Sequence, residues 1–368
     1  MINPTFSALT ALLAGLALMP GAAAAQRAKA QPIKVQPIKP GVASQIPNHL
    51  KINAWTIGLA AGRTEGAPLR FAAELARELD DGHEMRVLPI VTRGPFDNVF
   101  DLLHLRGVDL AVVSGDILEF IKKDPAGGVI ARKIAYVMPL VPAEVHILVR
   151  PEINSLKDLE GKPVNFNTAG TQAAYTGPIL FERLGIKVVP HFIPHGQAMA
   201  QMQKGETFAA TFWVSSKPLD PLAKPKFPPG FKLLPVPATD KLLEYYFPTY
   251  LEADDYPGLI ESGQRIETVA VPTVLAAFNW PKDSDRYRRQ QRFVDYLFKR
   301  LPNLQSKPGY DAKWKDINLA ASVPGWTRLP LMQARLDAAA AEAKRAVPAA
   351  EKRAAVPPAP PPAAPKAP

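Results

Sequence analysis

The sequence predicts a mixed α/β protein made of two lobes, with a ligand cleft between them. Three observations favour this class. Apolar runs of strand length alternate with amphipathic helical stretches, polar turns follow the strands, and a second α/β region opens at Ser155 after two extra β-rich runs. The chain has 368 residues, 47% of them hydrophobic, which is enough for two medium-sized domains.

The two ends of the chain differ from the body between them. An apolar N-terminal stretch ends in small residues at Ala25, which predicts a signal peptide over residues 1–25 and a periplasmic mature protein. An uncleaved membrane anchor is the alternative. Residues 26–48 are expected to form a Pro- and Lys-bearing linker, and residues 338–368 an Ala/Pro/Lys-rich disordered tail.

Charge and cysteine content exclude several classes of function. The formal net charge is +10, but residues 26–50 carry +4 of it and residues from 338 onward +3, so the body is only weakly basic. Since the body also has no nucleic-acid-binding motif, we expect no nucleic-acid partner. The absence of cysteine excludes disulfides, a lipid-modified cysteine, thiolate catalysis and cysteine-ligated metal.

Three strand–turn–helix units open the body. Their helices carry apolar residues at i, i+3, i+4 spacing, and their third strand is apolar throughout, as in a sheet covered on both faces. The predicted segments are strands at 52–59, 85–91 and 108–113, helices from Pro68 and Phe96, and further strands at 134–140 and 145–149.

A second α/β region follows, and the chain then returns toward the first. Pro178 lies within a predicted helix that runs toward Leu184, and it must either kink this helix or mark its start. The predicted segments are strands at 164–167, 188–193, 208–214 and 268–278, with helices around 198–204 and 284–300. We therefore divide the body into lobe 1, residues 49–143 and 245–335, and lobe 2, residues 144–244.

Polar turns at the carboxyl ends of the predicted strands are the candidate ligand site. Ligands of open α/β sheets bind at these ends, and the helix N-termini that follow attract carboxylate or phosphate groups. The alternative is that turns are polar for backbone reasons alone. The candidate ligand-binding residues are Arg63, Thr64, Glu65, Thr92, Arg93, Asn98, Ser114, Asp116, Asn167, Thr168, Gly170, Thr171, Gln172, Trp213, Ser215 and Lys217.

Motifs of catalysis and metal binding are absent from the sequence. There is no G-x-S-x-G elbow, no P-loop and no complete zinc-protease motif. His191 and His195 have the spacing of a helical metal pair, but Pro190 and Pro194 argue against a helix there. We expect a protein that is not an enzyme and that needs neither a metal nor a cofactor.

Short segments in a fixed order along about 200 residues match the motifs of one receptor family. They are TRGPFDN at 92–98, GVDLAVVSGD at 107–116, LKDLEGK at 156–162, TAGTQ at 168–172, KGE at 204–206, AA at 209–210, YPG at 256–258 and ETVAV at 267–271. Through them the chain resembles the TAXI group of solute receptors for tripartite (TRAP) transporters. Pro95 and Ala169 replace serines of the family pattern.

The resemblance implies a periplasmic-binding-protein type II fold whose two lobes close on the ligand about a hinge. It also implies a small anionic solute as ligand, of the amino acid or dicarboxylate class, and delivery of that solute to membrane TRAP permease subunits. The alternative is a periplasmic sensor that presents its ligand to a membrane signalling kinase. We expect a monomer.

Overall fold

The structure is a computed structural model that describes residues 54–354. The exceptions within this range are Glu65, His83, Asp124, Ala126, Pro225 and Lys226, and only the backbone is described for Glu119 and residues 346–354. The predicted signal peptide (1–25), the predicted linker (26–48) and residues 355–368 of the predicted tail lie outside the described residues. All described residues belong to one unit of the chain, Asn48–Pro368.

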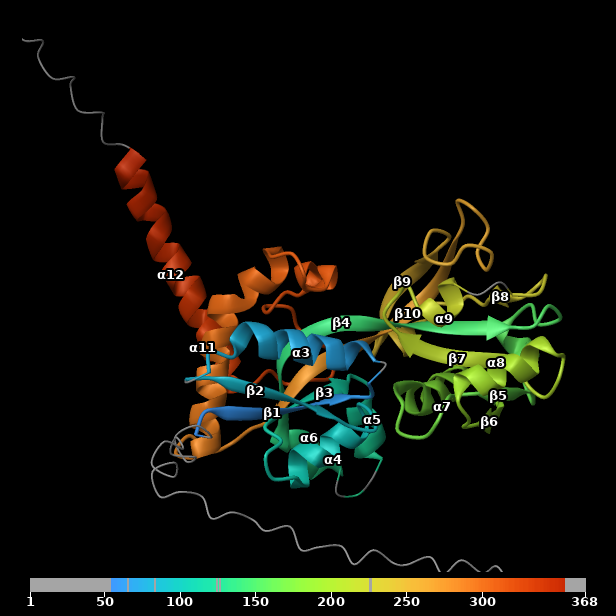
Figure 1. The fold of residues 1–368 in the computed structure, drawn as a ribbon, viewed down its shortest axis with the longest axis horizontal. Helices are drawn as coiled ribbons and strands as arrows, with labels where there is room; N and C mark the ends of the chain where they lie inside the picture. Colours follow the sequence, from blue (N-terminus) through green and yellow to red (C-terminus); the bar gives the residue numbers. More distant parts are fainter. Residues whose placement is uncertain are drawn as a thin grey trace, which may run out of the picture. The chain divides into compact units, whose positions relative to one another are not determined.

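A mixed sheet of ten strands runs through the described part of the chain (Figure 1). Its order is β2-β1-β3-β10-β4-β7-β5-β6, with β8 paired to β4 and β9 paired to β10. The strands are β1 (Thr56–Gly62), β2 (Arg86–Val91), β3 (Leu110–Ser114), β4 (Ile134–Val149), β5 (Pro163–Asn165), β6 (Val189–His191), β7 (Ala210–Ser215), β8 (Lys232–Leu233), β9 (Phe247–Glu252) and β10 (Arg265–Phe278).

The first lobe is doubly wound, with helices on both faces of parallel strands β1, β2 and β3. Phe71 and Leu75 of α3 pack with Phe293 of α11 on one face, and Val99 of α4 packs with Ile117 of α5 on the other. The helices of this lobe are α3 (Ala67–Leu79), α4 (Asp97–His104), α5 (Ile117–Lys122), α6 (Gly127–Lys133), α11 (Asp285–Ser306), η2 (Ala312–Asp316) and α12 (Pro330–Ala354).

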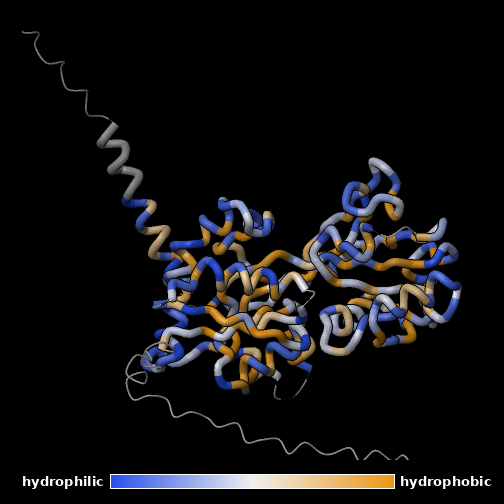
Figure 2. The backbone as a smooth tube through the Cα atoms, viewed as in Figure 1, coloured by the Kyte–Doolittle hydropathy of each residue, from blue (hydrophilic) through white to orange (hydrophobic). Residues whose placement is uncertain are grey.

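The second lobe repeats this plan with shorter strands. Phe166 and Phe181 pack with Phe212 on the face covered by α7, and Met202 packs with Leu222 on the face covered by α8 and α9. Figure 2 shows hydrophobic segments along the sheet in both lobes. The helices are η1 (Leu156–Leu159), α7 (Gln172–Leu184), α8 (His195–Gln203), α9 (Asp220–Ala223) and α10 (Asp240–Leu243).

Two long antiparallel strands, β4 and β10, pass from one lobe into the other. Leu140 of β4 lies in a cluster of the first lobe, whereas Val145 of the same strand lies in a cluster of the second. The pairing of β4 with β10 shifts register around Pro272, opposite a stretch that contains Pro142. Because proline has no N–H to donate, the ladder is weakest where the strands leave one lobe for the other.

The predicted α/β class and two-lobed type II architecture are confirmed. The runs predicted at 134–140 and 145–149 are parts of the single strand β4. Pro178 does not mark a helix start, because α7 begins at Gln172 and continues through this proline. Among the described residues, no helix is both long enough and apolar enough to cross a membrane.

Two predicted boundaries differ from the structure. Residues 245–271, expected in lobe 1, pack in the second lobe, because Tyr246 and Leu251 are buried in its clusters and β9 pairs with the adjoining half of β10. The chain thus returns to the first lobe only after Pro272. Residues 338–354, expected to be disordered, belong to α12, because this stretch is rich in the strong helix formers Ala, Glu, Lys and Arg.

Candidate functional site

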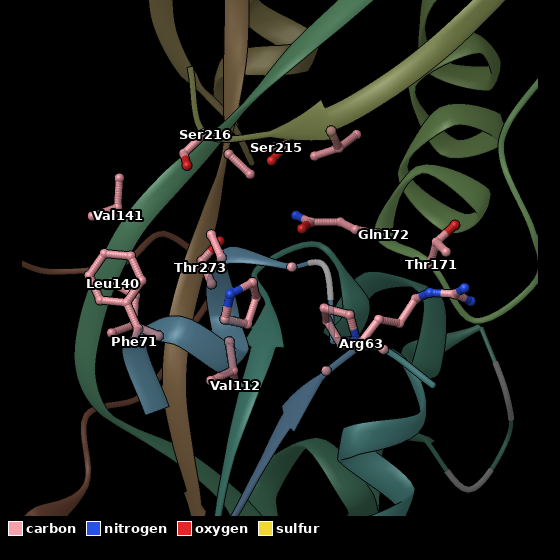
Figure 3. Close-up of a pocket in the computed structure, with 18 of the residues that line it drawn as sticks. Arg63, Phe71, Val112, Leu140, Val141, Thr171, Gln172, Ser215, Ser216 and Thr273 are labelled. Atoms are coloured by element: carbon pink, nitrogen blue, oxygen red, sulfur yellow. The ribbon is translucent and has the colours of Figure 1, made fainter. Parts of the chain in front are cut away.

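A cleft of about 140 Å³ lies at the junction of the lobes, beside the two crossing strands (Figure 3). Its walls come from the loops after β1 and β2, the first turns of α3 and α7, the end of β7, and the middle of β4 and β10. A cavity of ~150 Å³ in another protein holds benzene, so this volume suits a small molecule.

The loop between β1 and α3 supplies the charge of the cleft. Arg63 is the only charged side chain among the described residues that line it. Its Nη1 lies 3.4 Å from Oγ1 of Thr168, a residue of the second lobe. Gly66 is the N-cap of α3, whose first turn contains Pro68 and no acidic residue.

The first turn of α7 faces the same space from the second lobe. Thr171 is the N-cap and is largely buried, and Gln172 begins the helix, with no acidic residue in the first turn. Gln172 Nε2 donates to Ser114 Oγ in the first lobe over 3.0 Å. Two helix N-termini, one from each lobe, therefore border the cleft, and helix N-termini attract anions.

Three hydroxyl groups add neutral donors and acceptors. Ser215 and Ser216 lie at and just beyond the end of β7, and Thr273 lies on β10. Within the described part of the chain, these hydroxyls have no hydrogen-bond partner. Figure 3 shows Ser215 and Ser216 on one side of the space into which Gln172 extends.

The remaining wall is apolar. Phe71 of α3, Val112 of β3, and Leu140 and Val141 of β4 line it, and Phe71 and Val112 are almost fully buried. Figure 3 shows Phe71, Leu140 and Val141 opposite Arg63, Thr171 and Gln172. The cleft thus combines one charged side chain, several hydrogen-bonding side chains and an apolar wall.

The loops that border the cleft approach each other closely across the lobes. A Cβ added to Gly94 would lie 2.1 Å from the carbonyl oxygen of Gly170, so only glycine fits at this position. Phe96 of the first lobe stacks on Tyr175 of the second, with ring centroids 3.8 Å apart. Lys123 of the first lobe forms an exposed ion pair of 2.8 Å with Glu182 of α7.

Asp116 joins the lobes from a fully buried position. Its carboxylate accepts hydrogen bonds from Ser114 Oγ (2.5 Å), from Thr176 Oγ1 of α7 (2.7 Å) and from the Tyr246 hydroxyl (3.2 Å). Burial raises the pKa of this carboxyl group, and the three hydroxyl donors offset part of the rise. Arg183 lies over the Tyr246 ring, with its Cζ atom 5.8 Å from the ring centroid.

The structure brings together only some of the candidate ligand-binding residues. Arg63, Thr171, Gln172 and Ser215 line the cleft. Thr168 and Ser114 do not line it but hydrogen-bond to Arg63 and Gln172. Asn167 and Gly170 shape the turn before α7 with positive φ values of 64° and 89°.

Other candidates have structural roles away from the cleft. Asn98 is fully buried, and its side-chain amide donates to the carbonyl oxygens of Ala61 and Val112 over 2.9 and 2.7 Å. Its side-chain oxygen accepts from Thr92 over 2.6 Å. Asn98 therefore ties α4 to β1 and β3, a role that the turn pattern does not distinguish from ligand binding.

The rest of the candidates also point elsewhere. Arg93 pairs with Asp97 at 3.2 Å on the exposed surface. Trp213 packs in the second lobe, and Lys217 donates to the carbonyl oxygen of Tyr250 over 2.6 Å. Thr64 is exposed and does not line the cleft, and Glu65 lies outside the described residues.

Most residues that line the cleft were not candidates in the sequence analysis. Phe71, Leu140, Val141 and Thr273 lie within elements that look like ordinary core strands and a core helix, and nothing in their local pattern marks a ligand wall. Ser216 directly follows the candidate Ser215, and the position of both at a strand end was the available indication.

The two spaced histidines do not form a pair on one helix. His191 belongs to β6, and His195 begins α8 directly after Pro194. His195 stacks on Trp213 with ring centroids 3.6 Å apart, and burial lowers its pKa to about 3. Among residues that the structure describes, no group of three or more His, Asp or Glu side chains is arranged to hold a metal ion.

No protein-family model and no curated protein matches the chain. Among solved structures, it is similar to the periplasmic binding protein BugD, with 12% identity over 77% of this chain and 93% of that chain and a TM-score of 0.43. It is also similar to a TRAP periplasmic solute-binding protein from Haemophilus influenzae with bound L-gulonate (11% identity, 75% and 90% coverage, TM-score 0.37). A third is AbpA, an amino acid ABC transporter substrate-binding protein from Streptococcus pneumoniae bound to L-arginine (14% identity, 73% and 98% coverage, TM-score 0.39). Similarity at these identities and TM-scores does not identify a ligand or an activity. The function is therefore inferred from the chemistry of the cleft.

Proposed function

We propose that the protein is a non-catalytic receptor that captures a small anionic solute between its two lobes. The observation that carries this proposal is the lining of the cleft, to which Arg63 and the N-terminus of α3 from one lobe and the N-terminus of α7 from the other all contribute. A carboxylate bound there would contact both lobes at once, so it would favour their closed arrangement.

The composition of the cleft supports binding rather than catalysis. The described polar side chains that line it are Arg63, Thr171, Gln172, Ser215, Ser216 and Thr273. An activated hydroxyl nucleophile needs a base within hydrogen-bond reach, and none of these side chains is a carboxylate or an imidazole. The hydroxyl groups therefore serve as neutral hydrogen-bond partners for a ligand.

The crossing strands support a hinge. The lobes are joined by β4 and β10, whose pairing is interrupted around Pro142 and Pro272 beside the cleft. Rotation of the lobes about this segment would open the cleft and separate Gln172 from Ser114. A periplasmic location and delivery of the solute to a TRAP-type secondary transporter complete the proposal, and they rest on the apolar N-terminus and the motif resemblance of the sequence.

A thermal-shift screen of residues 26–368 tests the receptor function. The probes are carboxylates, sulfonates and phosphates, each matched with its neutral amide or alcohol. A ligand at ~100 times its dissociation constant stabilises the folded state by about 2.7 kcal/mol, which raises the melting temperature of a protein of this size by a few degrees. We expect one class of anion to give this shift and its neutral partner to give none. A screen in which no anion stabilises the protein would contradict the proposal.

A further inference from the structure

We infer that closure of the two lobes takes up one proton, which Asp116 binds at their junction. This inference rests on the lobe closure of the proposed receptor function, and it adds pH as a regulator of the cleft. It follows from the position of Asp116 between the lobes, from its connection to the cleft, and from the chemistry of its partners.

The first step concerns the position of Asp116. It follows β3 in the first lobe and accepts a hydrogen bond from Ser114 Oγ of the same lobe over 2.5 Å. Its other two donors, Thr176 Oγ1 at 2.7 Å and the Tyr246 hydroxyl at 3.2 Å, belong to the second lobe. Only 2% of the residue is exposed. Separation of the lobes would remove both donors of the second lobe and would admit water to the carboxyl group.

The second step concerns the connection between Asp116 and the cleft. Gln172, which lines the cleft, donates to Ser114 Oγ over 3.0 Å, and Ser114 in turn donates to Asp116. Gln172 and Thr176 lie about one turn apart on α7, so they move as one body. Opening of the cleft would therefore break the hydrogen bonds of Gln172 and of Asp116 together. The state of the cleft and the surroundings of the carboxyl group are thus coupled.

The third step concerns the partners of Asp116. Within the described part of the chain, Asp116 forms no ion pair, and its side-chain partners are three neutral hydroxyl groups. Burial without a counter-charge disfavours an ionised carboxylate, and this raises the pKa of Asp116, although the three donors offset part of the rise. In the open form, water would replace this environment and solvate the charge.

The ionisable groups that the second lobe brings toward Asp116 are two tyrosines and one arginine. Arg183 of α7 lies over the rings of Tyr245 and Tyr246, with its Cζ atom 3.4 and 5.8 Å from the ring centroids. Burial, together with the nearby carboxyl group of Asp116, raises the pKa of Tyr246 above its ordinary value of 10.0. The Tyr246 hydroxyl therefore stays neutral and remains a hydrogen-bond partner over the physiological pH range.

The ionisable groups on the side of the first lobe all belong to α5, the helix that follows Asp116. Neither β3 nor residues 269–278 of β10 contain an ionisable residue. Lys122 lies at the far end of α5, roughly 9 Å along the helix axis, and Lys123 pairs with Glu182. Only the backbone of Glu119 is described, and a negative charge on its side chain would add to the cost of ionising Asp116.

Closure therefore raises the affinity of Asp116 for its proton. In the open form the carboxyl group would meet water, and its pKa would lie nearer the ordinary value of 3.8 than in the closed form. Between these two pKa values the protein takes up a proton when it closes, so a lower pH favours the closed form and tighter capture of a solute. Since one proton is involved, the ratio of closed to open forms changes at most tenfold per pH unit.

The separation of the lobes at different pH values tests the inference without any solute. The chain has no cysteine, so Leu105→Cys in the first lobe and Val189→Cys in the second, both at exposed positions, can carry a pair of fluorophores. We expect the energy transfer between the labels to fall as the pH rises from 5 to 8 at constant ionic strength, because the lobes separate. Energy transfer that is the same at every pH overturns the inference.

Three variants of the labelled protein assign the proton to a residue. Asp116→Asn stays neutral at every pH, so we expect its energy transfer to lose the dependence on pH. Glu78→Gln is the matched control, because Glu78 is a buried carboxyl group that accepts from the Tyr310 hydroxyl over 2.5 Å within the first lobe. Glu144→Gln removes a buried carboxyl group of β4 that accepts the Lys217 backbone N–H over 2.9 Å within the second lobe. Both of these variants are expected to keep the wild-type response to pH.

The outcomes separate the proton linkage from the receptor function. A response to pH that survives Asp116→Asn overturns the inference, and its loss in Glu144→Gln would assign the proton to Glu144 instead. An anion that stabilises the protein in the thermal-shift screen keeps the receptor function even when the separation of the lobes does not depend on pH. The profile of the labelled protein without these substitutions tests the linkage independently of the folding of any of the three variants.

Discussion

Arg63 carries the charge that the ligand carboxylate would meet, although it is an exposed side chain in a loop. Arg63→Gln keeps hydrogen-bonding groups but removes the charge. Since a hydrogen bond to a charged group contributes ~1.5–3 kcal/mol, we expect the anion to bind roughly 10- to 100-fold more weakly. Titration calorimetry with the best anion measures this loss.

The matched control for Arg63→Gln is Arg288→Gln. Arg288 is an exposed arginine of α11, paired with Asp285 and remote from the cleft. Its replacement is expected to leave the affinity unchanged. Equal losses in both variants would show that net charge, rather than a contact in the cleft, attracts the anion.

The buried carboxyl group of Asp116 predicts a dependence of stability on pH. Its pKa is raised in the folded protein above the ordinary value of 3.8, so the folded state holds this proton more strongly than the unfolded state. Its contribution to stability is therefore greatest below pH 4 and is lost as the pH rises through the raised pKa. Above that pKa the loss is complete.

Asp116→Asn removes this titration while keeping the shape of the side chain. We expect the free energy of unfolding of the wild type, measured by urea denaturation, to fall relative to that of the variant as the pH rises from 4 toward neutrality. The hydroxyl donors Ser114, Thr176 and Tyr246 remain in both proteins. Parallel pH profiles for the two proteins would show that Asp116 does not titrate differently in the folded state.

The same residues show where inference from the sequence stops. Asn98, Asp116 and Arg63 all occur in polar turns or helix starts after strands, and the sequence treats them alike. In the structure, Asn98 is internal to the first lobe, Asp116 lies between the lobes, and Arg63 lines the cleft. The difference depends on which side chain points to which neighbour, and this is decided by contacts far apart in the sequence.

At the scale of elements, the turn after β2 and the turn before α7 must pass within contact distance. Gly94→Ala would place a methyl group against the Gly170 carbonyl oxygen, at a backbone position with a φ of 150°. Each lobe retains its own core in this variant, so we expect a folded protein whose lobes cannot close and whose anion affinity is at least tenfold lower.

Gly263→Ala controls for the strain of the substitution itself. Gly263 has a φ of 77° and no neighbour within 4 Å of an added Cβ. A side chain there strains the backbone by roughly 1–2 kcal/mol without obstructing another element. We expect a lower melting temperature with unchanged anion affinity, and an equal loss of affinity in the two glycine variants would argue against closure.

Most elements could be predicted from their periodicity, whereas their membership in a lobe could not. The strands and helices of the first 60 described residues follow the predicted order, because each carries its own apolar face. The lobe membership of β4 and β10 could not be predicted. A strand that packs in two hydrophobic cores has the same local sequence pattern as a strand that packs in one. Composition was misleading for α12, where alanine and charged residues form a helix.

At the scale of the whole molecule, a substitution of Thr176 tests whether its hydrogen bond to Asp116 holds the two lobes closed. Thr176→Val removes the 2.7 Å hydrogen bond from α7 to Asp116 with little change in size. Loss of a partner for a buried polar group costs ~1–3 kcal/mol. We expect a larger radius of gyration in solution scattering without ligand, and a decrease when the anion is added.

Thr268→Val is the matched control, because Thr268 is a buried threonine that donates to the Val145 carbonyl oxygen over 2.7 Å within the second lobe. This variant is expected to lose stability but to keep the wild-type radius of gyration. If both variants scatter alike, the hydrogen bond to Asp116 does not control the arrangement of the lobes.

Two contacts join the lobes near the cleft: Phe96 stacks on Tyr175, and Lys123 pairs with Glu182. A captured molecule can leave only after such contacts break, so they lengthen its residence time in addition to any effect on affinity. Stacked rings are insensitive to salt, whereas an exposed ion pair is screened by it. The escape rate of the solute should therefore rise only modestly with ionic strength, with the aromatic pair providing the larger part of the kinetic barrier.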